Sequence, residues 1–362
     1  YRNDITEIEG FDNLHQPEGI FLELQKDAAS LYGADKSYYM VNGSTGGILS
    51  ALSAALPMRG HILMARNCHK SAYHAAYLRQ LTISYLMPPL LAEYDICDAV
   101  TPDQVSSALE KEPDIQAVLI VSPSYEGRIA NVREIARIVH KKGIPLIVDE
   151  AHGAHLGLAE EVHENSCQAG ADLVIHSVHK TLPALTQSAL LHVCGDLINI
   201  DLLESFLHIY QSSSPSYLLA ASIDNAVAYI NKNGGMIFSA FAERYIRMRR
   251  ELDVCRYLRF PPLDDERQDL GKLVISVKET NLTGKELYDI LVQKYHLQPE
   301  MAAKSFVLVM FTMNDSQEGY DRLVRALKDI DAGLSYATGI AGGEAKGMVI
   351  SERETGEEQI PF

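Results

Sequence analysis

The 362 residues are 47% hydrophobic, which is enough to bury the core of one large domain and a smaller one. With 32 basic against 48 acidic side chains, the net charge is −16 and there is no basic block, which argues against nucleic acid and anionic membranes as partners. No apolar run approaches the length of a membrane span, and the five cysteines lack CxxC or metal-type spacing. We therefore expect free thiols, no metal site and a cytoplasmic location.

The first predicted elements follow a polar segment over residues 1–20, which we expect to be a loop. Apolar residues from Gly19 to Leu31 have helical spacing. A short strand is predicted over 38–41, a turn over 42–47, and a helix over 48–56 that Pro57 stops.

Ser44, Thr45 and Gly46 in this turn form a candidate anion site. Glycines let the backbone approach a ligand, hydroxyl groups donate hydrogen bonds, and the helix N-terminus offers free N–H groups with positive potential. From the turn alone, an ordinary N-cap formed by Ser44 or Thr45 is an equal alternative. The turn is not a nucleotide-binding P-loop, because no Gly-Lys-Ser/Thr follows.

The middle of the chain alternates between strands and helices. The strands are expected over 61–65 and 117–121, the helices over 71–81 and 131–140, and a loop over 86–98. Thr101, Pro102 and Gln104 occupy the N-cap, first and third positions of another helix. This alternation continues to Val193 and predicts an α/β domain with a mostly parallel sheet and helices on both faces.

Polar residues end two apolar runs in the segment 143–193. The run 144–148 leads into Asp149, and the run 172–175 leads into His176-Ser177-Val178-His179-Lys180. Open α/β sheets bind ligands at the carboxyl ends of their strands, so we expect one site there. A lysine between apolar strands fits a desolvated nucleophilic amine that forms a Schiff base, and Pro183 is expected to keep its segment a fixed loop.

These motifs together resemble the fold-type-I pyridoxal-5′-phosphate (PLP) enzymes, and more fully the bacterial Orn/Lys/Arg decarboxylase family. The resemblance extends from about Glu7 to about Ala221. The stretches that carry it are VNGSTGGILSAL (41–52), ARNCHKSAYHA (65–75), SPSYEGRIANV (122–132), DEAH (149–152) and SVHK (177–180).

The resemblance implies that PLP is the cofactor, with Lys180 as its Schiff-base lysine. It implies that Asp149 pairs with the pyridine nitrogen and that His69 stacks on the ring; without the resemblance, helix caps are the alternative for both. Ala151 would lie against the ring. His152, which stands where larger members have tryptophan, would touch the ring or its O3′ side.

At the phosphate, the resemblance implies contacts from Ser177 and His179 besides the anion site at 44–46. It leaves Glu150 and His155 with structural roles. It also implies that the loop 211–217 reaches the phosphate of a neighbouring subunit, with an ordinary Ser/Pro loop as the alternative.

The implied activity is decarboxylation of arginine, lysine or ornithine in a homodimer with its site at the subunit interface. The acids that would recognise the distal cation, among them Glu7, Asp12 and Glu126, cannot be ranked from the sequence. An α-oxoamine synthase is an alternative, but those enzymes usually have Ser-Lys where this chain has His179-Lys180. An aminotransferase would need an arginine for a second carboxylate, and none is identifiable. A PLP-binding protein without turnover would bind the cofactor and form no amine.

The C-terminal third predicts helices over 201–210, from 217 through 229 and over 237–254. It then predicts strands over 272–277 and 306–311, with helices over 283–294 and 318–334. We therefore expect a PLP-binding major domain at 1–235, a small α+β domain at 236–336 and a tail at 337–362. The chain begins at Tyr1 without the Pro-Gly-His-Lys segment of the family, and we expect it to be truncated.

Overall fold

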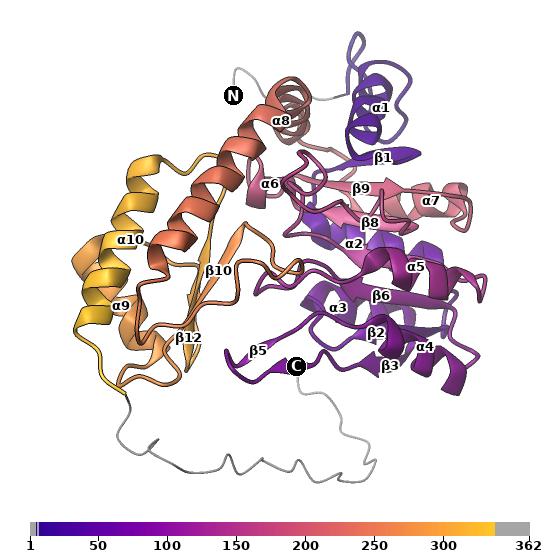
Figure 1. The fold of residues 1–362 in the computed structure, drawn as a ribbon. Helices are drawn as coiled ribbons and strands as arrows, with labels where there is room; N and C mark the ends of the chain where they lie inside the picture. Colours follow the sequence, from indigo (N-terminus) through magenta and orange to yellow (C-terminus); the bar gives the residue numbers. More distant parts are fainter. Residues whose placement is uncertain (1–4, 6, 337–362) are drawn as a thin grey trace.

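A seven-stranded sheet is the centre of the N-terminal part of the chain (Figure 1). The computed structural model describes residue 5 and residues 7–336. The strand order is β1 (Lys36–Met40), β9 (Ala189–Val193), β8 (Leu173–His176), β7 (Leu146–Asp149), β6 (Ala117–Val121), β2 (His61–Ala65) and β3 (Thr82–Leu86). All neighbours pair in parallel except those of β9, which is antiparallel to both β1 and β8. The predicted α/β fold with a mostly parallel sheet is confirmed.

Two groups of helices cover the sheet. One group contains α2 (Gly43–Ala55), which packs on β7, β8 and β9 and contacts α3 (Lys70–Arg79) and α7 (Ile200–Tyr210). The other contains α5 (Val132–His140), which packs on β7 and contacts α4 (Pro102–Lys111). The predicted start of α4 is confirmed, because Thr101 and Gln104 form a reciprocal capping box.

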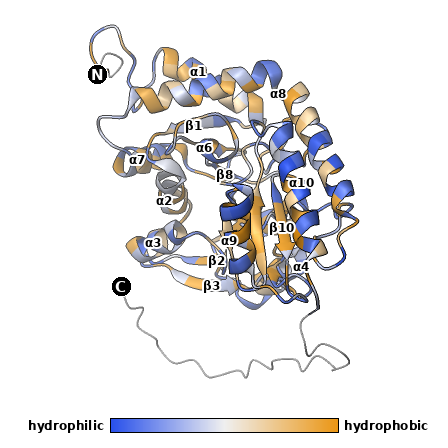
Figure 2. Ribbon diagram, turned by 90° about the vertical axis from the view of Figure 1, so that its left-hand side faces the viewer, coloured by the Kyte–Doolittle hydropathy of each residue, from blue (hydrophilic) through white to orange (hydrophobic). Residues whose placement is uncertain are grey.

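A three-stranded antiparallel sheet lies in the C-terminal part. Its order is β10 (Lys272–Ser276), β12 (Phe306–Met310) and β11 (Met301–Ala302), and α9 (Gly284–Tyr295) and α10 (Gln317–Ala332) accompany it. In Figure 2 the strand β10 has the hydrophobic colour, whereas α9 and α10 carry both colours, as expected for helices with one face on a core. Both strands and both helices predicted here are confirmed.

A single long helix, α8 (Tyr217–Leu252), connects the two parts. It begins beside α1 (Ile20–Tyr32) and packs on α10 further along. Two helices with a domain boundary at 235/236 were expected, but that boundary falls inside α8. The helix is continuous there because buried residues recur at helical spacing on both sides of that boundary, at Ile230, Gly234 and Phe238. The division into domains stays a prediction, and the expected tail at 337–362 lies outside the described residues.

Three local predictions were wrong. A short hairpin of β4 (Leu90–Leu91) and β5 (Ile96–Cys97) occupies the region 86–98 that was expected to be a loop, and the strand β3 just before it was not predicted. Because β3 is a partly exposed edge strand, its sequence lacks a buried apolar run. Helix α2 starts at Gly43, not at 48, and Lys180 lies in one helical turn, α6 (Val178–Thr181), not in a loop. Pro183 follows that turn and does not interrupt it.

No helix in the described ranges is long and apolar enough to cross a membrane.

Candidate active site

The carboxyl ends of five strands, β1, β2, β6, β7 and β8, supply the walls of one cavity of about 580 Å³. This is the edge at which parallel α/β sheets bind ligands. Nine of the ten predicted site residues line the cavity: Ser44, Thr45, His69, Asp149, Ala151, His152, Ser177, His179 and Lys180. The structure therefore brings together side chains that are up to 136 positions apart in the sequence, from Ser44 to Lys180.

Gly46, the tenth predicted residue, does not line the cavity. A Cβ placed there would meet Asn42 at 3.3 Å and Met40 at 3.4 Å, so Gly46 serves close packing of α2. Gly43 lines the cavity instead, with a φ of +71° that favours glycine. The motif identified the correct turn. Which of its glycines lines the cavity is decided by the start of α2, which is earlier than predicted.

The N-terminus of α2 forms one end of the cavity. The backbone N–H groups of the first helical turn have no partner within the helix, and the N–H of Gly46 is the first to bond back, to the carbonyl of Asn42 at 3.3 Å. Neither Ser44 nor Thr45 is the N-cap, since that position belongs to Asn42. The Ser177 hydroxyl donates to Ser44 Oγ at 2.9 Å. This end of the cavity thus concentrates donors suited to an anion.

His179 stands beside this end with a fixed orientation. Its Nδ1 lies 2.8 Å from the carbonyl oxygen of Ser188. A carbonyl oxygen only accepts, so Nδ1 carries a proton and Nε2 is left for another partner.

Asp149 ends β7 and is 4% exposed. Among the described residues its carboxylate accepts one hydrogen bond, from the N–H of Ala151 at 3.2 Å. Burial raises the pKa of Asp149, against the opposing effects of the hydrogen bond from Ala151 and of the charge on Lys180. A buried carboxylate with so few donors is suited to a ligand that brings an N–H group of its own.

His69 is both a cavity residue and a helix cap. Its Nδ1 accepts from the backbone N–H of Ser71 at 3.3 Å, at the start of α3. Burial lowers the pKa of His69, so the imidazole is neutral with its proton on Nε2. The structure holds the ring at the cavity wall, and its stacking on a cofactor stays a prediction.

Lys180 contacts a histidine and, through it, a second lysine. The Lys180 Nζ lies 3.1 Å from His152 Nε2, and the Nζ of Lys272 lies 3.0 Å from His152 Nδ1. Burial lowers the pKa of Lys180, against the opposing charges of Asp149 and Glu300. Lys272 was not predicted as a site residue, because in the sequence it is only the first residue of an apolar strand.

Tyr125 and Glu300 were also missed. Tyr125 lines the cavity and its hydroxyl donates to Glu300 Oε1 at 2.8 Å. The three acids named as candidates for the distal cation, Glu7, Asp12 and Glu126, do not line the cavity. Asp12 accepts from backbone N–H groups at the start of α1, and Glu126 accepts from the Ser124 hydroxyl at 3.0 Å.

Glu150 and His155 do not line the cavity and have contacts of the structural kind that was expected for them. Glu150 accepts from the N–H of Ser166 at 3.0 Å and lies 2.8 Å from His176 Nε2. Burial raises the pKa of Glu150 to about 8. His155 Nε2 lies 2.8 Å from Asp269 Oδ1.

An acid at the end of one parallel strand, a partly buried lysine after the next and a helix N-terminus at the same cavity define the fold-type-I class of enzymes. Comparison with known proteins then gives the family. The chain belongs to the Orn/Lys/Arg decarboxylase family, because the model of the major domain of that family matches residues 1–308. The resemblance inferred from the motifs is confirmed.

Two curated relatives come from Bacillus subtilis strain 168. An arginine decarboxylase is 32% identical over 338 residues, which cover 92% of this chain and 69% of that protein. The uncharacterized protein YaaO is 41% identical over 228 residues, covering 63% of this chain and 48% of that one. Among solved structures, lysine decarboxylase A from Pseudomonas aeruginosa matches with a TM-score of 0.78 at 18% identity. That match covers 90% of this chain, which spans about half (53%) of the Pseudomonas chain.

Proposed function

We propose that this protein decarboxylates a basic amino acid (arginine, lysine or ornithine), using PLP held at Lys180. The observation that carries the proposal is that Lys180 and Asp149 line one cavity at the ends of adjacent parallel strands. The names of the relatives, arginine decarboxylase and lysine decarboxylase, support the reaction and the substrate class. Family membership favours decarboxylation over the synthase and aminotransferase alternatives.

The residues of the cavity fit PLP on structural grounds. The buried Asp149 carboxylate has capacity for a donor from the pyridine nitrogen, and the first turn of α2 with Ser177 offers donors for a phosphate. The cofactor, when bound, supplies a conjugated ring that accepts the electron pair of a bond broken at the substrate Cα.

The side chains of the chain have separate tasks in this proposal. Asp149 would hold a proton at the pyridine nitrogen, because its buried carboxylate still has acceptor capacity beside the bond from Ala151. His69 would cover one side of the ring and exclude water from it. Lys180 would supply the amine that binds the cofactor, since burial lowers the pKa of this amine.

A carboxylate beside the cavity supports a cationic substrate. Glu300 and the Tyr125 hydroxyl form a pair at 2.8 Å, and the charge of Glu300 acts on both Lys180 and Lys272. A carboxylate in this place would favour a substrate whose side chain carries an ammonium or guanidinium group.

The test is a visible absorption spectrum of the chain with PLP, before and after separate additions of arginine, lysine and ornithine. We expect the band of lysine-bound PLP, shifted by one of the three, and release of CO₂ with the corresponding amine. A chain that binds PLP and releases no CO₂ from any of them would contradict the proposed activity.

We propose further that the protein is a cytoplasmic homodimer. The dimer is supported by exposed apolar side chains on α7 and at the start of α8, namely Leu202, Ile209 and Leu218. Because α7 packs on α2, this surface is close to the anion end of the cavity. Sedimentation equilibrium should give twice the mass of the chain, and a monomer at micromolar concentration would contradict the dimer.

A further inference from the structure

Lys272 is an unusual residue to bury. It begins β10, is 1% exposed, and its Nζ contacts His152 Nδ1 at 3.0 Å and Met310 Sδ at 3.5 Å. The Nζ also lies 5.2 Å from the centre of the Tyr125 ring. None of the described carboxylates forms an ion pair with it. Burying an ammonium group without a direct counter-ion costs free energy, so we expect Lys272 to have a function that offsets this cost.

The two lysines on His152 cannot both be charged donors. Burial lowers the pKa of His152 well below its usual range, so its imidazole is neutral and has one N–H donor and one acceptor nitrogen. An ammonium can donate only to the acceptor nitrogen. The lysine at the other nitrogen must accept the imidazole N–H, and it therefore has to be an uncharged amine.

The surrounding carboxylates favour the charge on Lys272. Burial alone would raise the pKa of Asp269, but its contact with His155 lowers it, so Asp269 stays ionised behind Lys272. Burial lowers the pKa of Lys272, and the charges of Asp269 and Glu300 oppose that effect. The acid facing Lys180 is Asp149, whose own pKa burial raises, so it is a weaker counter-charge.

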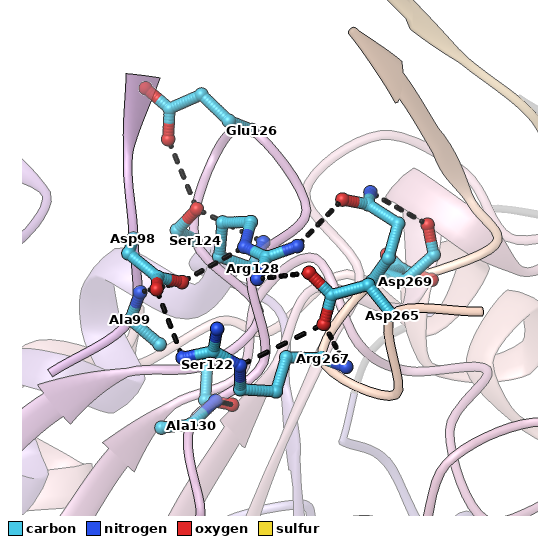
Figure 3. Close-up of polar contacts among 11 residues, drawn as sticks. Asp98, Ala99, Ser122, Ser124, Glu126, Arg128, Ala130, Asp265, Arg267 and Asp269 are labelled. Carbon is cyan, nitrogen blue, oxygen red and sulfur yellow. Dashed lines mark hydrogen bonds and ion pairs between the residues drawn. The ribbon is translucent and has the colours of Figure 1, made fainter. Parts of the chain in front are cut away.

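An ion-pair network centred on the buried Arg128 fixes the segment that carries Lys272 (Figure 3). Arg128, whose side chain is 0% exposed, pairs with Asp98 at 2.9 Å and with Asp265 at 2.7 Å. Arg267 pairs with the other oxygen of Asp98 at 2.9 Å. The backbone adds a hydrogen bond from Asp269 N–H to the Gly127 carbonyl at 2.8 Å. The loop after β6 thus holds the 265–272 segment against the cavity.

We propose that Lys272 is a positioning residue that keeps the Lys180 amine uncharged. The hydrogen-bonded chain Lys272–His152–Lys180 carries a single positive charge, and the ammonium group of Lys272 holds it. In the resting arrangement Lys272 donates to His152 Nδ1, and His152 Nε2–H donates to Lys180 Nζ. When Lys180 needs a proton, Lys272 passes one to Nδ1 as the Nε2 proton moves to Lys180. One proton is transferred in total, and no electrons move. The inference rests on the proposed role of Lys180 as the cofactor-binding amine.

The charged groups that influence the Lys272–His152–Lys180 hydrogen-bond chain come from several elements. Asp149 on β7 and Glu300 before β11 act on the Lys180 end, and the neutral but titratable His69 before α3 is within range of the Lys180 charge. Asp269, Glu126 and Glu300 act on the Lys272 end.

The test measures the pKa of Lys180 in the full chain without PLP or substrate. Competitive labelling with acetic anhydride across a pH series, read by mass spectrometry, gives the reactivity of this one amine. We expect Lys272→Met to raise the pKa of Lys180 by at least about one unit, since a nearby positive charge is removed. Lys272→Arg retains the charge and should leave the pKa low. Lys278→Met, which breaks the surface ion pair with Asp95, is the control that should change nothing at Lys180.

An unchanged Lys180 pKa in Lys272→Met, or an equal rise in Lys272→Arg, would overturn the proposal. Circular dichroism establishes that each variant is folded. A second measurement needs no change at Lys272: ¹⁵N spectra of histidine-labelled chain, assigned with His152→Gln, should show a neutral ring protonated on Nε2. A ring protonated on Nδ1 would refute the resting arrangement. Because neither experiment uses the cofactor, their failure is distinct from a failure of the proposed decarboxylase activity.

Discussion

Gly127 lies directly against Lys272. A Cβ at position 127 would come within 2.5 Å of the Lys272 Cβ, and the residue has a φ of +88°. We therefore expect Gly127→Ala to push Lys272 away from His152 and to lower the free energy of unfolding by about 1–3 kcal/mol. Urea unfolding measures the stability, and labelling of Lys180 measures the displacement. Gly143→Ala is the matched control, because Gly143 has a φ of +68° with no atom within 4 Å of the added Cβ, and it should leave Lys180 unchanged.

Lys180→Ala should abolish the visible band of lysine-bound PLP. The reason is that Lys180 lines the cavity together with Asp149, whose charge acts on its amine. Borohydride reduction followed by peptide mapping should locate the cofactor on Lys180 in the wild-type chain. Lys141→Ala, at the exposed end of α5, should keep the band. A reducible adduct that persists in Lys180→Ala on Lys272 would reassign the cofactor-binding residue.

Asp149→Asn should lower kcat for decarboxylation by about 100- to 1,000-fold, the usual effect of removing one aimed electrostatic group. The amide keeps the size of the side chain and its acceptor for Ala151 but cannot carry the negative charge. The measurement is CO₂ release at saturating PLP, with Asp103→Asn in the first turn of α4 as a surface control. Turnover within a few-fold of wild type would restrict Asp149 to a structural role.

Arg128→Met should destabilise the chain by about 3–5 kcal/mol, because it leaves Asp98 and Asp265 buried or half-buried with fewer partners. The exposed pair of Arg133 and Glu164 gives the comparison, since Arg133→Met at the surface should change stability little. Equal midpoints of urea unfolding for the two variants would show that the Arg128 network does not hold the segment 265–272 in place.

The raised pKa of Glu150 leads us to expect that the stability of the fold depends on pH. Burial raises its pKa from 4.5 to about 8, so the folded chain retains a proton that the unfolded chain has lost. This contribution is fully present below pH 4.5 and disappears as the pH rises through 8. The lowered pKa of His176, about 3 against 6.5, has the opposite effect but acts only below pH 6.5. Glu150→Gln imitates the protonated acid, and its melting temperature should exceed that of wild type more at about pH 8.5 than at about pH 6.5. A constant difference between the two chains would contradict the assignment.

The parts of the site that could be predicted are those encoded next to strand ends. Asp149 ends one buried apolar run, and Ser177 and Lys180 lie within four residues after another, so local sequence places them at one edge of a parallel sheet. The choice of Gly43 over Gly46 depends on where α2 starts, and a turn with several glycines does not determine that.

Other features depend on contacts between distant segments and left no local signal. Lys272 and Glu300 contact the cavity residues His152 and Tyr125 only because the small sheet docks on the loop after β6. The continuity of α8 through two glycines likewise comes from its partners, since its buried stripe is shared between two parts of the fold. Sequence patterns describe single elements well, and they describe poorly the contacts that join one element to another.

Lys272 follows Lys180 by 92 residues, and this order has a consequence during synthesis. A ribosome releases the strand β7 with Asp149 and the helical turn α6 with Lys180 before it has made β10. The emerging chain would thus have the cofactor-binding amine without the residue that holds its proton. A nascent chain stopped at residue 250 should therefore have a Lys180 whose pKa is higher than in the chain that includes β10, and this amine should capture PLP more slowly at neutral pH. Cofactor loading would then be timed by the arrival of β10 and not by the exposure of the lysine itself.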